Sequence, residues 1–553
     1  MKKTLLIASL GLLSMNLQTQ AEGLQEWTAK VTGVSTIDEL YLQAPVCVDQ
    51  AGSTYTTGQF TQPITIGSTT LEPIANSAYL AKYHADGTAA WAIGLSGAAT
   101  ITSVTTDENN NVYIAGTFAD VVLVGSTDGK TQEIKGAENE TNKTASFIAS
   151  YNADGALQAV RTFLAQTNED AANSGLYFPD NGYPYITIKH LEAGNGKIYA
   201  SATHTGDVLI DDMKWGGMYL NVFDFMYSDL ESGGIFSLNA ADLKGAASVA
   251  HISVAEQFQS TQMGFENLNF TVDNGTVYLC FVANGKVKYD AAGKSEEITL
   301  TYDDLGSFEH AYIVSSIKDA TVKTKTFHAP AHTESAAYNR IGALKADDKN
   351  LYIGGTFFQQ LAFDNAQTHT DGTDLFVAAL NRETLELQWS HVSGLSEGDG
   401  KYFSENFNAM TVNGGVVSVY GYVLQDQNNE KKITAPLEYS FAGSGAANEN
   451  ATALITGADR RGETSALRSV DTESLEATLT VSAPTTGIQD VPALETQRVG
   501  NTFFFDRATD VQVYDLQGRL LQQARKVTSV SIDHLQQGVY VLTDGRASVK
   551  VQK

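Results

Sequence analysis

Apolar and polar residues alternate along most of this chain in short runs, and turns rich in Asp, Asn and Gly separate the runs. Alternation with a period of two is typical of β-strands that bury one face. The pattern therefore predicts an all-β protein. It also shows where the strands are grouped, because the same sequence of strands and turns returns several times.

The repeated unit begins with two strands around a turn that contains Asp or Asn. A third strand follows, then a tight turn, then an outer strand that often carries Trp, so each unit predicts four strands. About six copies with this spacing are typical of a β-propeller. The clear copies of the first strand pair are 44–60, 101–118 and 341–357, and weaker ones are 188–202, 268–282 and 409–421.

The segment 26–33 matches an outer strand but has no inner strands before it. We interpret it as the strand that completes the last blade and so closes the ring, which removes exposed sheet edges. The sequence predicts six blades within residues 22–481, with seven as the alternative. The turns after the first and third strands of a unit are tight and share one face of the propeller. The long connections therefore lie on the opposite face.

The repeats resemble those of secreted bacterial propellers of the seven-bladed propeller repeat family, in which an Asp-containing turn leads into an aromatic strand that ends in Gly. The resemblance covers roughly residues 26–480 and implies the fold. It implies little about activity, because propellers serve as enzymes, adhesins and scaffolds.

Residues 1–21 combine a basic start, a short apolar run and small residues at the end, as secretory signal peptides do. Beyond them the sequence offers no apolar run long enough to span a bilayer. Without Lys2 and Lys3 the chain holds 34 basic and 63 acidic side chains, so we expect no nucleic-acid partner. Cys47 and Cys280 lie in apolar strands and are predicted to be buried free thiols.

Composition changes after the propeller. Residues 482–495 form a predicted linker, and residues 496–553 carry five short alternating runs that predict a small C-terminal β-sandwich. The expected strands are 502–505, 511–521, 529–532, 538–542 and 547–551.

This tail resembles the C-terminal sorting domain of proteins exported by the type IX secretion system of Bacteroidetes. Gln536 stands where many members have Pro. The resemblance implies passage through the periplasm, recognition by the type IX secretion machinery, removal of the tail, and a secreted or outer-surface location. The residues that carry it are Gly518, Leu535, Gly538, Tyr540, Lys550 and Lys553.

Two long insertions, 164–185 and 211–232, should be neighbours on the long-connection face. Aromatic rings beside carboxylates suit stacking on sugars and hydrogen bonds to hydroxyls. The other interpretation is a small satellite core that holds the insertions down. The candidate ligand-binding residues are Tyr177, Phe178, Tyr183, Tyr185, Trp215, Tyr219, Phe223, Asp224, Phe225 and Tyr227, with Asp180 and Asp229 nearby.

Zinc, nucleophile-elbow and phosphate-loop motifs are absent from the sequence, so we expect no metal and no cofactor. The acidic segment 364–374 is better explained as a solvated loop than as a calcium site. The leading hypothesis is a non-enzymatic binding module for a glycan or a protein. The alternatives are a carbohydrate-active hydrolase or lyase whose two carboxylates come from distant blades, and a structural surface component.

Overall fold

The computed structural model describes residues 24–32, 45–49, 51–136, 145–167, 184–222, 226–255, 264–300, 310–329, 340–358, 361–363, 373–393, 403–413, 416–427, 430–442, 465–471, 476–484, 497–499, 501–515, 520–535, 539–543 and 548–553. Throughout these residues the regular elements are strands, as the alternation predicts. The chain divides into two compact units, one of residues 25–483 and one that contains residues 484–553. Residues 1–21, the predicted signal peptide, lie outside the described part.

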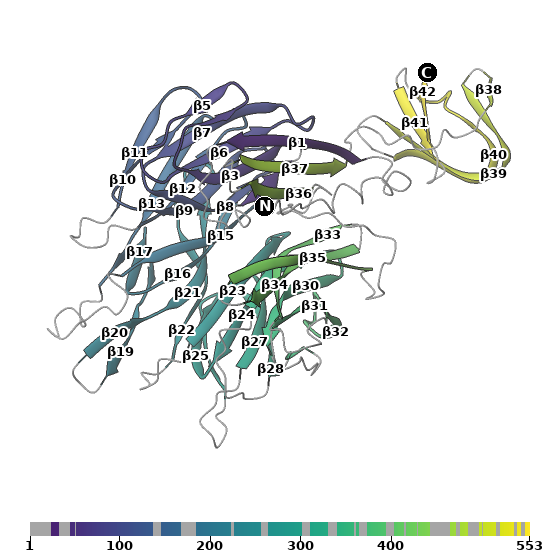
Figure 1. Cartoon of the computed structure of the whole chain (residues 1–553). Coiled ribbons are helices and arrows are strands. Elements are labelled where there is room, and N and C mark those ends of the chain that lie inside the picture. The colour runs from purple at the N-terminus through teal and green to yellow at the C-terminus, as the bar shows by residue number, and fades with distance from the viewer. Residues whose placement is uncertain are drawn as a thin grey trace. The chain divides into compact units, whose positions relative to one another are not determined.

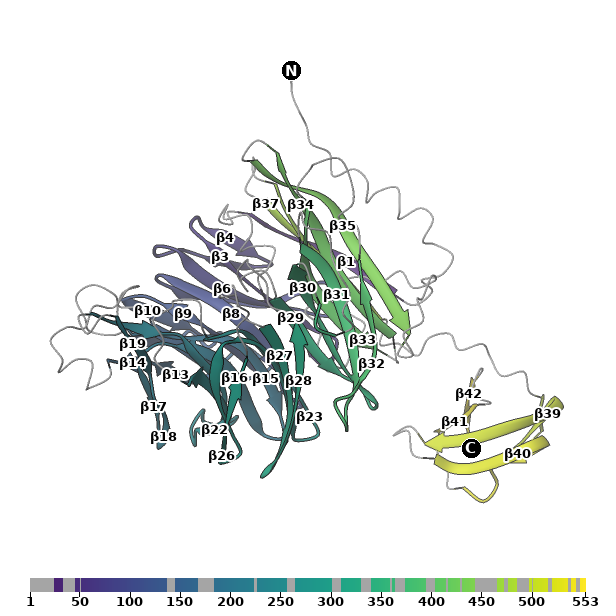
Figure 2. The same ribbon diagram turned by 90° about the horizontal axis from the view of Figure 1, so that it is seen from below.

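Five sheets of the larger unit contain four strands that follow one another in chain order, each antiparallel to the next. This is the blade of a β-propeller, and the sheets succeed one another from purple through teal to green in Figure 2. The first three blades are β2 (Val46–Val48), β3 (Thr54–Phe60), β6 (Ser77–Tyr83), β7 (Ala89–Ser96); β8 (Ala99–Thr106), β9 (Val112–Phe118), β12 (Ala145–Tyr151), β13 (Leu157–Phe163); and β15 (Ile186–Gly194), β16 (Lys197–His204), β21 (Ser232–Asn239), β22 (Ala247–Val254). The next two are β23 (Gly264–Asp273), β24 (Thr276–Asn284), β27 (His310–Lys318), β28 (Thr321–Ala329); and β29 (Arg340–Ala346), β30 (Asn350–Phe358), β31 (Thr373–Asn381), β32 (Leu387–Val392).

The N-terminal strand pairs with a strand from the end of the propeller unit, as predicted. A sixth sheet holds β33 (Phe403–Asn413), β34 (Val416–Gln427) and β35 (Glu430–Ala442). A further sheet joins β36 (Ser465–Asp471) and β37 (Glu476–Pro484) to β1 (Leu24–Thr32), which hydrogen-bonds to β37. Figure 1 shows the purple β1 beside the green β37 and β36. This separate sheet favours seven blades over six, and the blade number stays a prediction.

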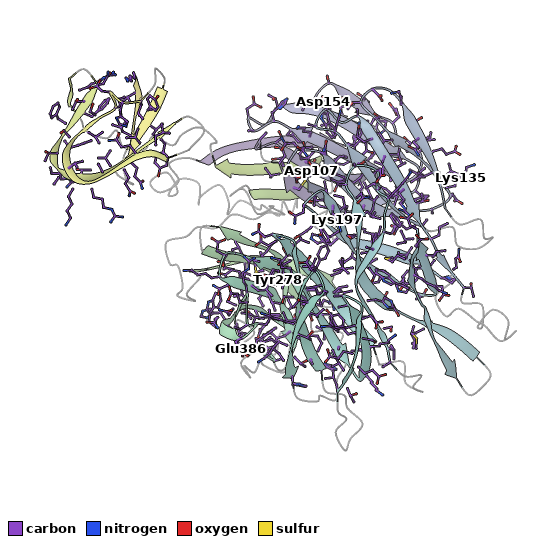
Figure 3. All side chains as sticks on the ribbon, turned by 180° about the vertical axis from the view of Figure 1, so that it is seen from behind. Asp107, Lys135, Asp154, Lys197, Tyr278 and Glu386 are labelled. Carbon is purple, nitrogen blue, oxygen red and sulfur yellow. The ribbon has the colours of Figure 1, made fainter. Side chains whose placement is uncertain are left out.

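The connections between the second and third strands of a blade form hairpins, where the sequence interpretation had loops. Two of these hairpins extend the preceding blade: β10 pairs with the outer strand β7, and β25 pairs with the outer strand β22. Lys135, at the end of β11, is labelled in Figure 3. The described hairpins are β4 (Ile64–Ile66) with β5 (Thr69–Leu71), β10 (Val121–Gly125) with β11 (Thr131–Lys135), β17 (Asp207–Ile210) with β18 (Met213–Trp215), β19 (Met218–Val222) with β20 (Met226–Leu230), and β25 (Lys286–Ala291) with β26 (Lys294–Thr299).

Among the described strands, a register shift recurs in the first strand of five sheets of the propeller unit. In the second blade it is a β-bulge between Ile101 and Ser103. The bulge brings an extra residue, Thr102, whose hydroxyl donates to the carbonyl of Ile188 in the next blade at 2.7 Å. The partner β9 carries Gly116 there, because a Cβ would lie 2.0 Å from the carbonyl oxygen of Thr100. Bulges bend a strand and re-aim its side chains. In the second blade the bulged residue makes an inter-blade bond.

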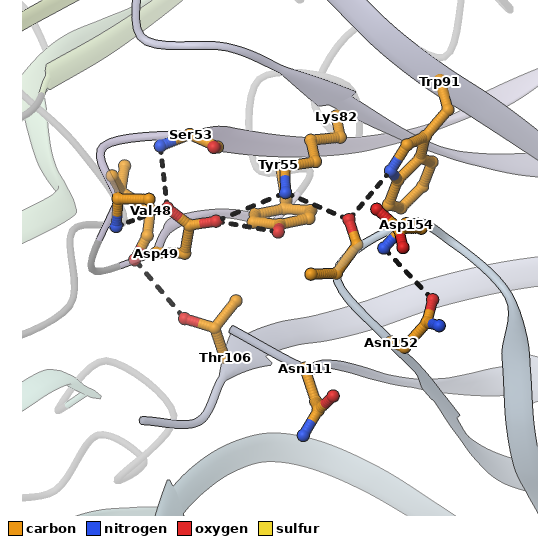
Figure 4. A network of polar contacts seen from close by, with 12 residues as sticks. Val48, Asp49, Ser53, Tyr55, Lys82, Trp91, Thr106, Asn111, Asn152 and Asp154 are labelled. Carbon is orange, nitrogen blue, oxygen red and sulfur yellow. Dashed lines mark hydrogen bonds and ion pairs between the residues drawn. The ribbon is translucent and has the colours of Figure 1, made fainter. Parts of the chain in front are cut away.

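The repeated Asp turn is a local hydrogen-bonded structure (Figure 4). The Asp49 carboxylate accepts the backbone N–H of Ala51 at 2.9 Å and of Ser53 at 2.8 Å, and the phenol of Tyr55 at 2.9 Å. Asp side chains favour such turns because they replace backbone acceptors. The same turn recurs at Asp107, which accepts the phenol of Tyr113 at 3.0 Å. The turn therefore explains why Asp and Tyr repeat together.

These turns lie on the same face as the third turns of neighbouring blades, as the alternation predicted. The carbonyl of Ala153, in the third turn of the second blade, accepts from Lys82 Nζ at 3.0 Å and from Trp91 Nε1 at 3.2 Å, both on the first blade. The phenol of Tyr113 also donates to the carbonyl of Ala240 in the third blade at 3.3 Å.

Apolar side chains fill the spaces between neighbouring blades. One cluster joins the first and second blades through residues such as Leu80, Ile114 and Phe147, which are 0% exposed. Cys47 and Cys280 are both buried and form no disulfide bond, which confirms the sequence prediction. Burial raises the pKa of Cys280, so this thiol is unreactive at neutral pH.

The C-terminal unit has five strands and a core of its own, which includes Phe503, Val513, Tyr540 and Val551. β39 pairs with β40 along one side. Along its other side, the start of β39 pairs with β38 and its end pairs with β41. β42 pairs with β41. The strands are β38 (Gln497–Val499), β39 (Thr502–Asp515), β40 (Leu520–Ser531), β41 (Val539–Thr543) and β42 (Ser548–Gln552).

Strand boundaries in this unit differ from those expected. The predicted strand 511–521 is wrong, because β39 ends at Asp515 and β40 begins at Leu520. Residues 502–505 and 511–515 instead belong to the single strand β39. Register shifts between Phe504 and Val511 let this strand bend while it stays paired with β40. The sandwich arrangement stays a prediction.

Candidate ligand-binding site at the base of two insertions

The ends of the two predicted insertions come together on the third blade, as expected. Ala165 and Gln166 form β14 at the start of the first insertion and pair with Val208 and Asp207 of β17. Tyr185, at its other end, accepts the backbone N–H of Thr205 and donates its own N–H to the Thr205 hydroxyl. Its phenol donates to the carboxylate of Glu231 at 2.5 Å. The described ends of the two insertions therefore share one hydrogen-bonded base.

Two glycines make this base possible. Gly206 has φ +70°, and a Cβ there would lie 2.4 Å from the carbonyl oxygen of Gln166 and 2.7 Å from Pro184. A Cβ on Gly217 would lie 2.4 Å from the carbonyl carbon of Gly206. The Gly217 N–H donates to the carboxylate of Asp207 at 2.7 Å. Larger residues would force the chain segments apart at this crossing.

The tip of the β17–β18 hairpin is held by Arg161 of the second blade. Its guanidinium makes bidentate bonds to Asp211, at 2.8 and 3.0 Å, and donates to the carbonyl of Leu243 at 2.8 Å. Asp211 also accepts the backbone N–H of Ala246 at 3.0 Å. The bond from Arg161, followed by that from Ala246, lowers the pKa of Asp211 to about 2, so this carboxylate stays charged at neutral pH.

Trp215 lies in the core, which differs from the exposed position expected for a ligand platform. Its side chain is 2% exposed, and its ring stacks on His204 and His251 with centroids 5.6 and 5.1 Å away. The indole N–H donates to the hydroxyl of Ser248 at 2.9 Å. At this residue the satellite-core interpretation describes what is observed.

Two further candidates, Tyr219 and Tyr227, lie on a second hairpin of the same connection. Tyr219 belongs to β19 (Met218–Val222), opposite Asp229 in β20 (Met226–Leu230), and Tyr227 lies opposite Asn221. Six candidates and one neighbouring carboxylate lie outside the described residues: Tyr177, Phe178, Asp180, Tyr183, Phe223, Asp224 and Phe225.

The sequence interpretation missed His204 and His251, which lie 47 residues apart in the chain. Their Nε2 atoms are 3.0 Å apart, and His204 Nδ1 lies 2.9 Å from the carbonyl oxygen of Gly206. A carbonyl only accepts, so Nδ1 of His204 carries a proton, and His251 donates to His204. Burial lowers the pKa of His204 to about 4 and that of His251 to about 3. Both rings are neutral at pH 7.

Among the described side chains, no group of three His, Cys, Asp or Glu residues could hold a metal ion. In the same residues there is no helix long and apolar enough to cross a membrane. Asp364 and Asp371 of the acidic segment lie outside the described part, and Asp374 is 1% exposed.

The sorting residues are placed in part. Tyr540 is 6% exposed in the C-terminal core, and the ammonium of Lys553 donates to the carbonyls of Asp533 and Leu535. Lys550 lies in β42. Gly518 and Gly538 lie outside the described residues.

No protein-family model and no curated protein matches the chain. Solved structures with similar folds include the β-propeller domain of the Trilobed protease from Pyrococcus furiosus (8% identity, 70% of this chain and 97% of that one, TM-score 0.26). Others are the WD40 domain of SCAP from fission yeast (8%, 80% and 96%, TM-score 0.28) and Drosophila Semaphorin 2a (9%, 95% and 96%, TM-score 0.30). These values are too low to carry an activity, substrate or partner to this chain.

Proposed function

We propose that this chain is a non-enzymatic binding protein that takes a glycan or a protein ligand on its two insertions. The observation that carries the proposal is the shared base, where Ala165 pairs with Val208 and Tyr185 bonds to Glu231. Two segments rich in aromatic and acidic residues leave the propeller from one small area. Rings beside carboxylates are suited to sugars, which present both apolar faces and hydroxyl groups.

The base supports binding because it is fixed from several sides. Arg161 holds the hairpin tip, Gly206 and Gly217 allow the close crossing, and Trp215 anchors the second strand in the core. A rigid base lowers the ordering cost that a ligand must overcome on binding. The propeller serves here as a scaffold for the two segments.

A soluble glycan array tests the proposal with the chain that lacks residues 1–21. Replacing Tyr177, Phe178 and Tyr183 together by Ala should weaken binding at least about tenfold. The control is Tyr302→Ala, a tyrosine in the connection between the second and third strands of the fourth blade. Equal binding by the triple variant would reject the site, and a blank array would reject the glycan. Release of sugar products would instead favour the hydrolase or lyase.

We also propose that residues 496–553 direct export through the type IX secretion machinery to the medium or the outer surface. The resemblance of the tail supports this, together with its separate core. A sorting signal that folds by itself can be removed without unfolding its cargo.

A further inference from the structure

The stack of His204, His251 and Trp215 joins the β17–β18 hairpin to strands β16 and β22 of the third blade. Trp215 ends β18, and the chain continues from there through Gly217 into the β19–β20 hairpin. The three rings stack with interplanar angles of 18° to 22°. Phe236 contacts the Trp215 ring edge-on at 5.8 Å, and a Cβ on Gly234 would lie 2.8 Å from that ring. Trp215 is therefore an apolar anchor of the hairpin on the blade, beside Val208, Ile210 and Met213.

The hydrogen bonds of the pair fix its protonation state. His204 donates from Nδ1 to Gly206, so its Nε2 accepts from Nε2 of His251. A proton added to His204 would place two N–H groups face to face at 3.0 Å. A proton added to His251 would place a charge on a ring that is 7% exposed. The proton on His204 therefore favours separation of the rings, and the proton on His251 favours exposure of that ring to water.

The charged groups around the pair offer limited compensation. Asp207 favours protonation of His204, but its carboxylate already accepts from Gly217 and lies 3.7 Å from Lys214 Nζ. Lys288 opposes protonation of His251. Asp290, opposite His251 on β25, lies 3.3 Å from Lys288. Glu231 precedes Ser232, which pairs with His204, and Glu231 accepts from Tyr185.

We propose that His204, His251 and Trp215 form an acid-sensitive latch that holds the β17–β18 hairpin at neutral pH and releases it in acid. The mechanism requires no ligand, although its use as regulation rests on the binding function proposed above. Both histidines have lowered pKa values in the closed form, and an unfolded segment binds protons near pH 6.5. Opening therefore takes up protons, and its equilibrium constant rises by up to about tenfold per pH unit for each histidine below pH 6.5.

Amide hydrogen exchange without ligand tests the latch. Amide exchange rates in β17 and β18 are measured at pH 7, 5.5 and 4.5, and each is compared with the rate of an unstructured chain at the same pH. Strands β8 and β9 serve as the reference region. The protection of β17–β18 should fall at least about tenfold between pH 7 and 4.5. His251→Gln keeps an N–H that can donate to His204 but removes one of the two titrating rings. In this variant the logarithm of the fold-loss of protection between pH 7 and 4.5 should be at most half of the wild-type value. The control His84→Gln, which removes an exposed histidine of the first blade, should match the wild type.

Unchanged protection in acid, or loss that spreads equally through β8 and β9, would overturn the latch. So would a His251→Gln chain with the pH dependence of the wild type. If that variant does not fold, nitrogen NMR of the wild-type imidazoles decides, because a ring that titrates near pH 6.5 in the closed form contradicts the mechanism. None of these measurements involves glycan, so failure of the binding proposal leaves them valid.

Discussion

The ammonium of Lys82 lies 3.6 Å from the carboxylate of Asp49, with the two side chains 10% and 0% exposed. The same ammonium donates to Ala153 of the second blade, and it lies 5.1 Å from the centroid of the Tyr55 ring. Arg382 repeats the arrangement farther along the chain, where it bonds to Asp273 of the preceding blade and to the phenol of Tyr278. Among the described residues, cations with little exposure thus connect adjacent blades at these two places in the propeller.

Lys82→Met should lower the free energy of unfolding by about 3 kcal/mol, because it leaves the Asp49 carboxylate buried without a cation. Lys325→Met is the control. Lys325 bonds to Glu386 at 2.8 Å, but the two side chains are 37% and 60% exposed, so its loss should cost less than about 1 kcal/mol. Urea unfolding of the propeller unit measures both. Equal costs would mean that the buried pair contributes no more than a surface pair.

Tyr55→Phe should cost about 1 to 2 kcal/mol, because it removes a buried donor from Asp49. Tyr151→Phe provides the opposite case. Tyr151 is 0% exposed, and among the described residues its hydroxyl has no hydrogen-bond partner. Its removal should be neutral or stabilising. A larger cost for Tyr151→Phe than for Tyr55→Phe in thermal unfolding would contradict this assignment.

Alkaline pH should destabilise the propeller above pH 10. Burial raises the pKa of Tyr151 and Tyr312, and burial with the nearby Asp49 charge raises that of Tyr55. The unfolded chain loses these protons first, near pH 10, so it binds fewer protons than the native chain and stability falls as pH rises. Absorbance at 295 nm should show these phenols ionising together with unfolding. Gradual ionisation of all tyrosines near pH 10 in a folded chain would exclude the effect.

The repeat was predictable because its signals are local. Asp107 and Tyr113 stand six residues apart and bond to each other, so each copy of the turn carries its own signature. The hairpins between second and third strands were not predicted. Their partners, such as β7 for β10, belong to another repeat, and strands of three to six residues show little periodicity.

Trp215 illustrates the same limit at the candidate site. Val208, Ile210, Met213 and Trp215 are all buried, and their alternation was a sequence signal for a strand pair that faces the core. Composition alone grouped Trp215 with the other aromatic residues of the insertion. His204 and His251 carry no spacing signal, because only the pairing of β16, β21 and β22 brings them together.

Ring closure predicts unequal effects of removing the two ends of the described chain. Deleting residues 24–32 removes the strand that pairs with β37 and should cost about 4 kcal/mol or more, beyond a severe single substitution. Deleting residues 485–553 should leave the melting temperature of the propeller within about 2 °C, because that segment belongs to the other compact unit. Calorimetry of both truncated chains gives the comparison. A β1 deletion that melts like the full propeller would show that closure adds no stability.

The last prediction concerns export. Deleting residues 547–553 removes β42, including Val551 of the C-terminal core and Lys553, whose ammonium bonds to the carbonyls of Asp533 and Leu535. The C-terminal unit loses both an edge strand and its terminal lysine, whereas the propeller loses nothing of its own sheets. If the tail is a sorting signal, a folded propeller should accumulate in the periplasm. Arg525→Ala, which removes an exposed charge of β40, is the control and should be exported normally. Cell fractionation with a protease-resistance assay of the propeller measures location and folding together, and undiminished surface or medium levels of the deletion variant would show that the tail is a structural domain without a sorting role.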